Sequence, residues 1–234
     1  MHKQTKPVYE YVDYDDYSEL RQLFESQALP AVRNMARKRG ITFQHHLIGS
    51  GHRHMVTRIK GGNGGFDLDY NLELQRCPDD PKKTKLILME CFDAALVPLG
   101  FEHSEDSTAV ITVKKVVDGR IEHSFDIALT FVDDDDVYYI HHDKGSERYL
   151  WSPRGGDYHL EDKIEVIEKV YSMSVYDVVR DSYLHLKNVN ADSQKRSFSL
   201  VAEANNNEFN NLLQTGRIVI QDEYDPYYDD DDDD

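Results

Sequence analysis

The sequence has no long apolar run and little cysteine. No stretch approaches the roughly 18 consecutive apolar residues that a membrane-spanning helix needs, so no membrane span is expected. Residues 1–4 also lack the apolar segment of a signal peptide. Cys77 and Cys91 are the only cysteines, and no His/Cys partners stand near them at zinc-finger spacing. We therefore expect a soluble, cytoplasmic protein with reduced cysteines.

Positive charge is also scarce. The net charge is −17, and the last fourteen residues carry nine acids and no base, which leaves −8 for the rest of the chain. An acidic body argues against tight, sequence-independent binding to a nucleic-acid duplex, so double-stranded nucleic acid is not an expected partner. Nucleotide binding remains open, because bound Mg²⁺ supplies positive charge locally.

Length and patterning predict an α+β protein with more than one part. A chain of 234 residues with 39% hydrophobic content suits one large domain or two small lobes around a cleft. We expect an acidic, aromatic arm over residues 1–17 and a lobe with a mixed sheet and flanking helices over residues 18–150. A small helical lobe over residues 158–216 and a disordered acidic tail over residues 217–234 would follow.

Hydrophobic periodicity predicts the individual elements. A stripe at helical spacing predicts a helix over residues 19–39, kinked at Pro30 and ended by Gly40. The Asp118–Gly119 pair between two β-rich runs predicts a two-residue hairpin turn. The other expected elements are strands at 42–48, 66–74, 109–117, 120–132 and 137–141, helices at 85–97, 160–171, 175–187 and 198–213, a loop at 78–83 and a linker at 151–158.

Three motifs in a fixed order form the candidate site. A predicted strand leads into Gly49–Ser50, and Asp67 and Asp69 follow in an alternating apolar strand. Asp126 comes later, in another predicted strand. Because side chains at i and i+2 leave the same face of a strand, Asp67 and Asp69 lie side by side.

Adjacent carboxylates predict a metal site. Two such groups among apolar neighbours are costly to ionise together unless a hard divalent cation offsets their repulsion. A third carboxylate from a neighbouring strand would allow Asp67, Asp69 and Asp126 to hold two Mg²⁺ ions, with Mn²⁺ as the alternative ion. Gly49 would let the backbone approach a phosphate closely, and Ser50 would offer a hydroxyl and an N–H.

The order of these motifs resembles the signature of the DNA polymerase β-like nucleotidyltransferases. The stretch LIGSGHRHMVTRIKGGNGGFDLDYNLEL, residues 47–74, resembles the cyclic GMP–AMP synthase branch, which makes oligonucleotide second messengers. SFDIAL, residues 124–129, is similar to the strand that carries that branch's third aspartate. The resemblance covers residues 18–132 and implies a nucleotidyltransferase-type catalytic lobe. Since the sequence shows no zinc insertion, sensing of double-stranded DNA is not implied.

The resemblance also implies an activity. Asp67, Asp69 and Asp126 would be catalytic metal ligands, with Asp126 nearest the acceptor, while Gly49 and Ser50 would contact the triphosphate. The reaction implied is transfer of a nucleoside monophosphate from an NTP to a hydroxyl, with release of pyrophosphate. A second nucleotide is the favoured acceptor, giving a cyclic or linear oligonucleotide. A small molecule, an RNA end and a protein hydroxyl remain open.

Other interpretations of these residues remain in view. A non-catalytic nucleotide-binding or regulatory protein could keep the same fold, although it would not need a complete carboxylate triad. The Asp67–Asp69 pair could also be a solvated strand edge. Phosphate charge that the ions do not cover calls for a cation from the first helix of the helical lobe. Lys163 is the first candidate for this cation and Lys169 the second.

Overall fold

The computed structural model describes residues 6–62, 65–134, 136–153, 160–191 and 195–219. Nearly all of the expected acidic tail, from residue 220 on, lies outside these ranges, as does most of the expected linker. Within the described ranges, no helix is both long and apolar enough to cross a membrane.

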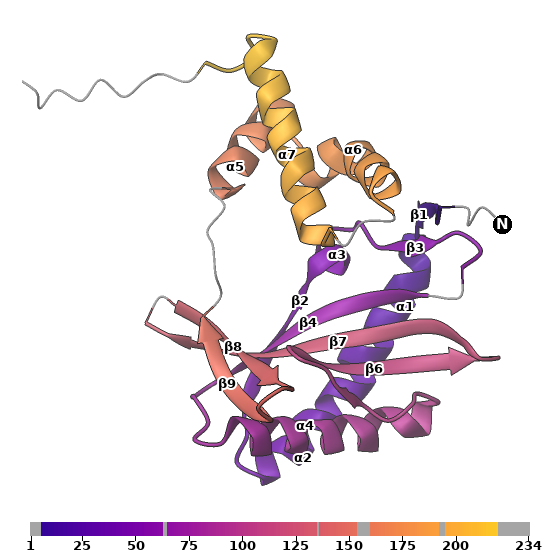
Figure 1. The fold of residues 1–234 in the computed structure, drawn as a ribbon, viewed down its shortest axis with the longest axis vertical. Coiled ribbons are helices and arrows are strands. Elements are labelled where there is room, and N and C mark those ends of the chain that lie inside the picture. The colour runs from indigo at the N-terminus through magenta and orange to yellow at the C-terminus, as the bar shows by residue number, and fades with distance from the viewer. Residues whose placement is uncertain (1–5, 63–64, 135, 154–159, 192–194, 220–234) are drawn as a thin grey trace, which may run out of the picture.

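Two groups of elements make up the structure: a mixed sheet with its covering helices, and three helices above one edge of that sheet (Figure 1). The first group comprises β1 (Tyr9–Tyr11), α1 (Tyr14–Leu23), α2 (Leu29–Lys38), β2 (Phe43–Ile48), α3 (Gly49–His52), β3 (Thr57–Ile59), β4 (Phe66–Leu74), α4 (Pro81–Leu96), β5 (Glu105–Asp106), β6 (Val110–Val117), β7 (Arg120–Asp133), β8 (Asp136–Asp143) and β9 (Arg148–Pro153). The second comprises α5 (Leu160–Tyr171), α6 (Val175–Val189) and α7 (Ser197–Gln214). The expected α+β class is confirmed.

The main sheet has the order β2-β4-β7-β6-β5, and β8 pairs with both β7 and β9, while β1 and β3 form a separate two-stranded antiparallel sheet. β4 and β7 run parallel, while the other paired strands run antiparallel. The predicted two-residue turn joins β6 to β7, and both of its residues have positive φ, 51° at Asp118 and 72° at Gly119. Both residues tolerate this conformation, which matches the twist of a hairpin.

One face of the sheet is covered by the α1–α2 rod and α4, and the core lies there. Phe24 stacks on Phe125 with ring centroids 4.1 Å apart and contacts Tyr70 at 4.6 Å. The β4 residues Phe66, Leu68, Tyr70 and Leu72 are buried on this face, so alternation directs the aspartates of the same strand to the other face. The packing of this apolar face therefore fixes which way the polar face points.

The first helix is longer and less regular than expected. Helical backbone runs from Tyr14 to Lys38, with a π-helical segment at Phe24–Ala28 just before Pro30. A proline has no N–H and its ring crowds the carbonyl of residue i−4, here Ser26, so the preceding turn widens. The irregularity therefore precedes Pro30, and the expected end of the arm at residue 17 falls inside α1.

Two other boundaries differ from the expected ones. α4 begins at Pro81, inside the expected loop, because the carboxylate of Asp80 accepts a hydrogen bond from Lys83 N at 2.9 Å and caps the helix. The expected linker begins with residues of β9, where Trp151 packs edge-on against Phe131 at 4.7 Å. Burial of that indole ring favours a strand over an exposed connection.

A second core joins the three C-terminal helices. It contains apolar side chains from α5, α6 and α7, and Met55, which follows α3, inserts among them. The N-terminal residues also reach this group, since Tyr9 N donates to Asn188 Oδ1 at 2.7 Å and Tyr11 Oη donates to Arg180 O at 2.6 Å. These contacts hold α6 beside the segment that contains Gly49–Ser50.

Candidate functional site

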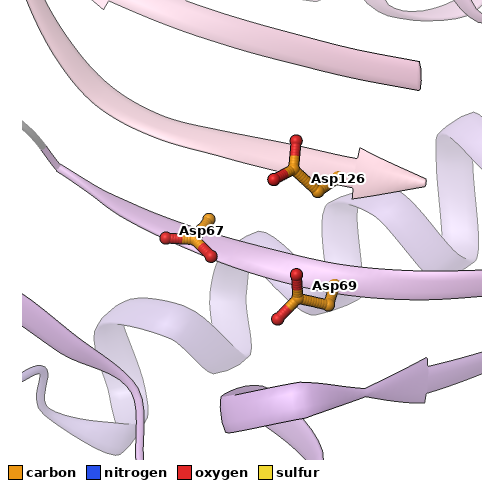
Figure 2. A group of neighbouring side chains, drawn as sticks. All are labelled: Asp67, Asp69 and Asp126. Carbon is orange, nitrogen blue, oxygen red and sulfur yellow. The ribbon is translucent and has the colours of Figure 1, made fainter. Parts of the chain in front are cut away.

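The three predicted aspartates meet on the polar face of the sheet. Asp67 and Asp69 lie on β4, and Asp126 lies on the parallel neighbour β7 directly opposite Asp69 (Figure 2). One carboxylate oxygen from each of the three falls within 4.8 Å of the others. The strand pairing alone brings these residues together, although more than fifty positions separate Asp69 from Asp126 in the sequence.

Partial desolvation and mutual repulsion disfavour ionisation of the two β4 carboxyls, of which Asp69 is half-buried and Asp67 is exposed. Loss of solvent raises the pKa of Asp69 to about 7, and the neighbouring charges of Asp67 and Asp126 add to this effect. Loss of solvent also raises the pKa of Asp67, with a further contribution from Asp126. These negative charges are opposed only in part by cations, because Arg53 and Lys187 lower the pKa of Asp69.

The donor set fits a hard divalent cation. Three converging carboxylates supply the oxygen ligands that Mg²⁺ and Mn²⁺ prefer. A cation between them would also offset the desolvation and the repulsion that together raise the pKa values of Asp67 and Asp69. The group contains neither histidine nor cysteine, the donors that predominate in structural zinc sites.

Gly49 is required by the close approach of the backbone to Asp69. Its φ is +62°, and a Cβ at this position would overlap the Asp69 carboxylate. Ile48, the preceding residue, pairs with Asp69, so the Gly49–Ser50 turn begins where β2 passes the aspartate. Glycine therefore lets the turn lie directly against the carboxylate cluster.

A cavity of about 290 Å³ opens beside two of the three aspartates, Asp67 and Asp69, while Asp126 lies next to them outside its lining. One wall is the Gly49–Ser50 turn with Asp67 and Asp69, and the opposite wall comes from α6 and α7. Arg53 and Lys187 supply positive charge to the lining. Lys187 Nζ donates to Thr57 Oγ1 at 2.6 Å, which holds its amine near the aspartates. The site thus combines acidic carboxylates with two cationic side chains, Arg53 and Lys187, which together are called the basic wall below.

Lys163, the cation predicted from the sequence, lies elsewhere. Its Nζ donates to Asn206 Oδ1 at 2.6 Å and stands over the ring of Phe209, within the three-helix group. It is not among the residues that line the cavity, so its position gives no support to a nucleotide-binding role. Sequence reasoning missed Lys187 and Arg53. The only available signals were a lysine at the end of a predicted helix and an arginine three residues after Ser50.

A larger groove of about 750 Å³ lies away from the aspartates. Its lining mixes acids such as Glu19 and Glu122 with bases such as Arg58 and Lys115. Since none of the three aspartates lines it, size alone does not identify the candidate site.

Comparison with known proteins gives similarity in structure only. No family model and no curated protein matches the sequence. Three solved structures are similar: the CD-NTase CdnG of Bradyrhizobium diazoefficiens in complex with GTP, Escherichia coli DncV in its 3′-deoxy GTP bound form, and the cyclic dinucleotide synthase CdnE of Elizabethkingia meningoseptica with GTP and Apcpp. Their identities to this chain are 15%, 13% and 14%, and their TM-scores are 0.48, 0.55 and 0.52.

These matches cover 82%, 82% and 81% of this chain. This chain in turn spans 63% of the CdnG chain, 66% of the DncV chain and 69% of the CdnE chain. The DncV and CdnE structures confirm the expected fold, a nucleotidyltransferase-type mixed sheet with flanking helices. At such low identity they establish the fold and not the reaction.

Gly49→Ala should disrupt divalent-cation binding. The new methyl group would displace the Asp69 carboxylate, so Mn²⁺ affinity should fall by more than about tenfold, as expected when a metal ligand loses its support. The decrease in free Mn²⁺ signal in electron paramagnetic resonance measures this binding.

Gly61→Ala is the matched control for the same substitution. Gly61 has a similar φ of +65°, but a Cβ there meets nothing within 4 Å. This variant should lose about 1 kcal/mol of stability through backbone strain and bind Mn²⁺ as the wild type does. Equal Mn²⁺ affinities in the Gly49 variant and the wild type would contradict the proposed contact.

Asp69→Asn should stabilise the metal-free protein above neutral pH. Because the pKa of Asp69 is raised to about 7 in the folded state, the wild type loses stability as the pH rises from about 4 to 7 and this carboxyl ionises only at a cost. The neutral variant avoids that loss, and its advantage at pH 8 should be about 1–3 kcal/mol.

Urea unfolding at several pH values measures this difference. The advantage should shrink towards pH 4, and Mg²⁺ should stabilise the wild type but not the variant. Asp133→Asn, an exposed carboxylate at the end of β7, should change stability by less than about 0.5 kcal/mol at every pH. An Asp69→Asn variant that is less stable than the wild type at pH 8 would contradict the raised pKa of Asp69 in the folded protein.

Proposed function

We propose that this protein is a metal-dependent nucleotidyltransferase that moves a nucleoside monophosphate from an NTP to a hydroxyl acceptor and releases pyrophosphate. The observation that carries the proposal is the convergence of Asp67, Asp69 and Asp126 beside the Gly49–Ser50 turn. Two Mg²⁺ or Mn²⁺ ions bound there would activate the attacking hydroxyl and neutralise charge on the leaving pyrophosphate.

The three carboxylates have separate tasks in this proposal. Asp67 and Asp69 would hold the ions next to the turn. Asp126, on β7, would lie nearest the acceptor and help to activate its hydroxyl. The hydroxyl oxygen bonds to the α-phosphorus while the bond from that phosphorus to the β-phosphate oxygen breaks, and the hydroxyl proton passes to solvent. A purely nucleotide-binding protein would not need three converging carboxylates, two of which, Asp67 and Asp69, ionise at a cost.

Triphosphate binding is assigned to the turn and the basic wall. Gly49 brings the backbone close to the aspartates, and Ser50 offers its hydroxyl to a phosphate. Lys187 and Arg53 line the same cavity. They would supply the cationic charge that the sequence predicts for Lys163. We propose that the sheet and the three-helix group act as two lobes around the nucleotide, which their separate cores support.

The acceptor in this proposal is a second nucleotide. CdnE was solved with GTP and Apcpp, so that neighbour holds two nucleotides, and DncV was solved in a 3′-deoxy GTP bound form. Carried over to this chain, these ligands favour an NTP donor and a nucleotide acceptor, with a cyclic or linear oligonucleotide signal as product. Within the residues that the structure describes, no comparable observation favours a small-molecule, RNA or protein acceptor.

Incubation with radiolabelled NTPs, singly and in pairs, tests the proposal. With Mg²⁺ or Mn²⁺, the wild type should release pyrophosphate and form an oligonucleotide that chromatography separates from the NTPs. Asp126→Asn should lower this turnover by at least about a hundredfold, because removing an anchoring metal ligand removes the ion's contribution. Asp133→Asn, the exposed control, should retain full activity. Equal turnover in the Asp126 variant and the wild type would refute the proposal.

Lys187→Met should weaken NTP binding, whereas Lys163→Met should not. Loss of a charge-assisted contact with the triphosphate predicts a KM for NTP raised by about 10- to 100-fold. Lys163 is hydrogen-bonded to Asn206 and does not line the cavity, so its variant should keep the wild-type KM. Steady-state kinetics measures the KM of each variant, and thermal unfolding midpoints show whether the substitution has also lowered the stability of the fold. A KM raised only in the Lys163 variant would restore the original sequence prediction.

A further inference from the structure

A threonine on β6 contacts the third aspartate. Thr112 lies directly opposite Asp126, and its Oγ1 donates a hydrogen bond to Asp126 Oδ1 at 2.6 Å. Since Thr112 is almost fully buried, this hydroxyl has little competing water. Asp126 Oδ2 takes no part in that bond and is free to face the carboxylates of β4.

A β-bulge creates this pairing. Near the turn, Val116 pairs with Ile121, but the register shifts by one residue between Lys115 and Val116. Continued without the shift, the hairpin would place Thr112 opposite Phe125, a core residue. The bulge instead aligns the buried Val113 with Phe125 and brings Thr112 to Asp126. Bulges near functional sites commonly redirect side chains in this way.

A second hydroxyl sets the direction of the hydrogen bonds. Ser107 Oγ lies 3.2 Å from Thr112 Oγ1. A threonine hydroxyl has one proton, and that of Thr112 points to Asp126, so Ser107 must be the donor of this pair. The two hydroxyls therefore form a chain directed at the carboxylate, in which each bond polarises the next.

A buried lysine beneath the sheet anchors the chain. Lys85 on α4 has a side chain only 1% exposed, and its Nζ lies 2.6 Å from both Ser107 O and Asp106 Oδ1. Tyr149 Oη also donates to Asp106. β5 comprises only two residues, so these contacts, more than strand pairing, hold the segment that carries Ser107.

We propose that Thr112 is a positioning residue that fixes the Asp126 carboxylate for metal binding, and that Ser107 and Lys85 hold Thr112 in place. This inference rests on the proposed function. The hydrogen bond fixes the rotation of the carboxylate and leaves Oδ2 for the ion. Because the donor is a neutral hydroxyl, it adds no positive charge that would compete with the metal ion for the Asp126 carboxylate.

Thr130 provides a matched control within the same sheet. Thr112 and Thr130 are 8% and 5% exposed and lie on adjacent strands. Thr130 Oγ1, however, donates to the Leu72 carbonyl at 3.4 Å and not to an aspartate. Valine has the same shape as threonine, so either replacement removes a buried hydroxyl without changing the size of the side chain. Only the replacement of Thr112 removes a hydrogen bond to Asp126.

The test measures Mn²⁺ affinity without nucleotide, and then turnover, in four variants of the full chain. Thr112→Val should weaken Mn²⁺ binding by about 10- to 100-fold, the usual effect of removing a group that orients a ligand. Turnover at a fixed, subsaturating metal concentration should fall in parallel, whereas the KM for NTP should change by less than about twofold, since the triphosphate contacts are intact. Thr112→Ser should restore both quantities, and Thr130→Val should leave both unchanged.

Ser107→Ala serves as the second, milder variant if the valine variant unfolds. It keeps Thr112 but removes the donor behind it, so Mn²⁺ affinity should fall by roughly threefold, consistent with one modest hydrogen bond. Wild-type Mn²⁺ affinity in a folded Thr112→Val protein, or an equal loss in Thr130→Val, would overturn the inference while leaving the proposed function intact. A wild type that binds no Mn²⁺ would overturn both.

Discussion

The parallel pairing of β4 with β7 is the constraint on which the rest of the site depends. It places Asp69 opposite Asp126, and the neighbouring pairs extend the same row across the sheet. Ile48 of β2 lies on one side of this row and Thr112 of β6 on the other. The start of the Gly49–Ser50 turn, the carboxylates of Asp69 and Asp126, and the hydroxyl of Thr112 therefore follow one another along a single row of paired strand residues.

Bringing these like charges together is unfavourable, and the apolar packing on the opposite face of the sheet provides the stabilisation that opposes it. The rings of Phe24, Tyr70 and Phe125 pack against one another there, which fixes the strands and therefore the directions of the aspartates. A site of mutually repelling carboxylates needs such a rigid scaffold, because a looser one would let them separate. Loss of solvent first, and then the repulsion between neighbouring carboxylates, raises the pKa values of Asp67 and Asp69 in this arrangement.

The sequence predicts those parts of the site that follow from local patterns. Period-two alternation was enough to place Asp67 and Asp69 on one face, and the resemblance pointed to Asp126. The cation of the basic wall depends instead on how α6 docks, and that docking is fixed by distant contacts such as Tyr9 with Asn188. Local patterns carry no information on such contacts, so the sequence predicts Lys163, whereas the cavity is lined by Lys187.

The role of Thr112 shows a similar limit. The Asp118–Gly119 turn correctly predicts the hairpin, but a regular two-residue turn implies a register one residue away from the observed one. The bulge arises because apolar side chains on both strands must share the core face, a condition set by tertiary packing. The position opposite Asp126 therefore becomes identifiable only in the folded sheet.

Anomalous diffraction from crystals grown with Mn²⁺ and a non-hydrolysable NTP tests the central claim most directly. The account predicts two anomalous peaks roughly 3.5–4 Å apart, the usual two-metal spacing, bounded by Asp67, Asp69 and Asp126. The triphosphate should lie against the Gly49–Ser50 turn. A nucleotide bound with no anomalous peak among these three carboxylates, or with its triphosphate outside this cavity, would contradict it.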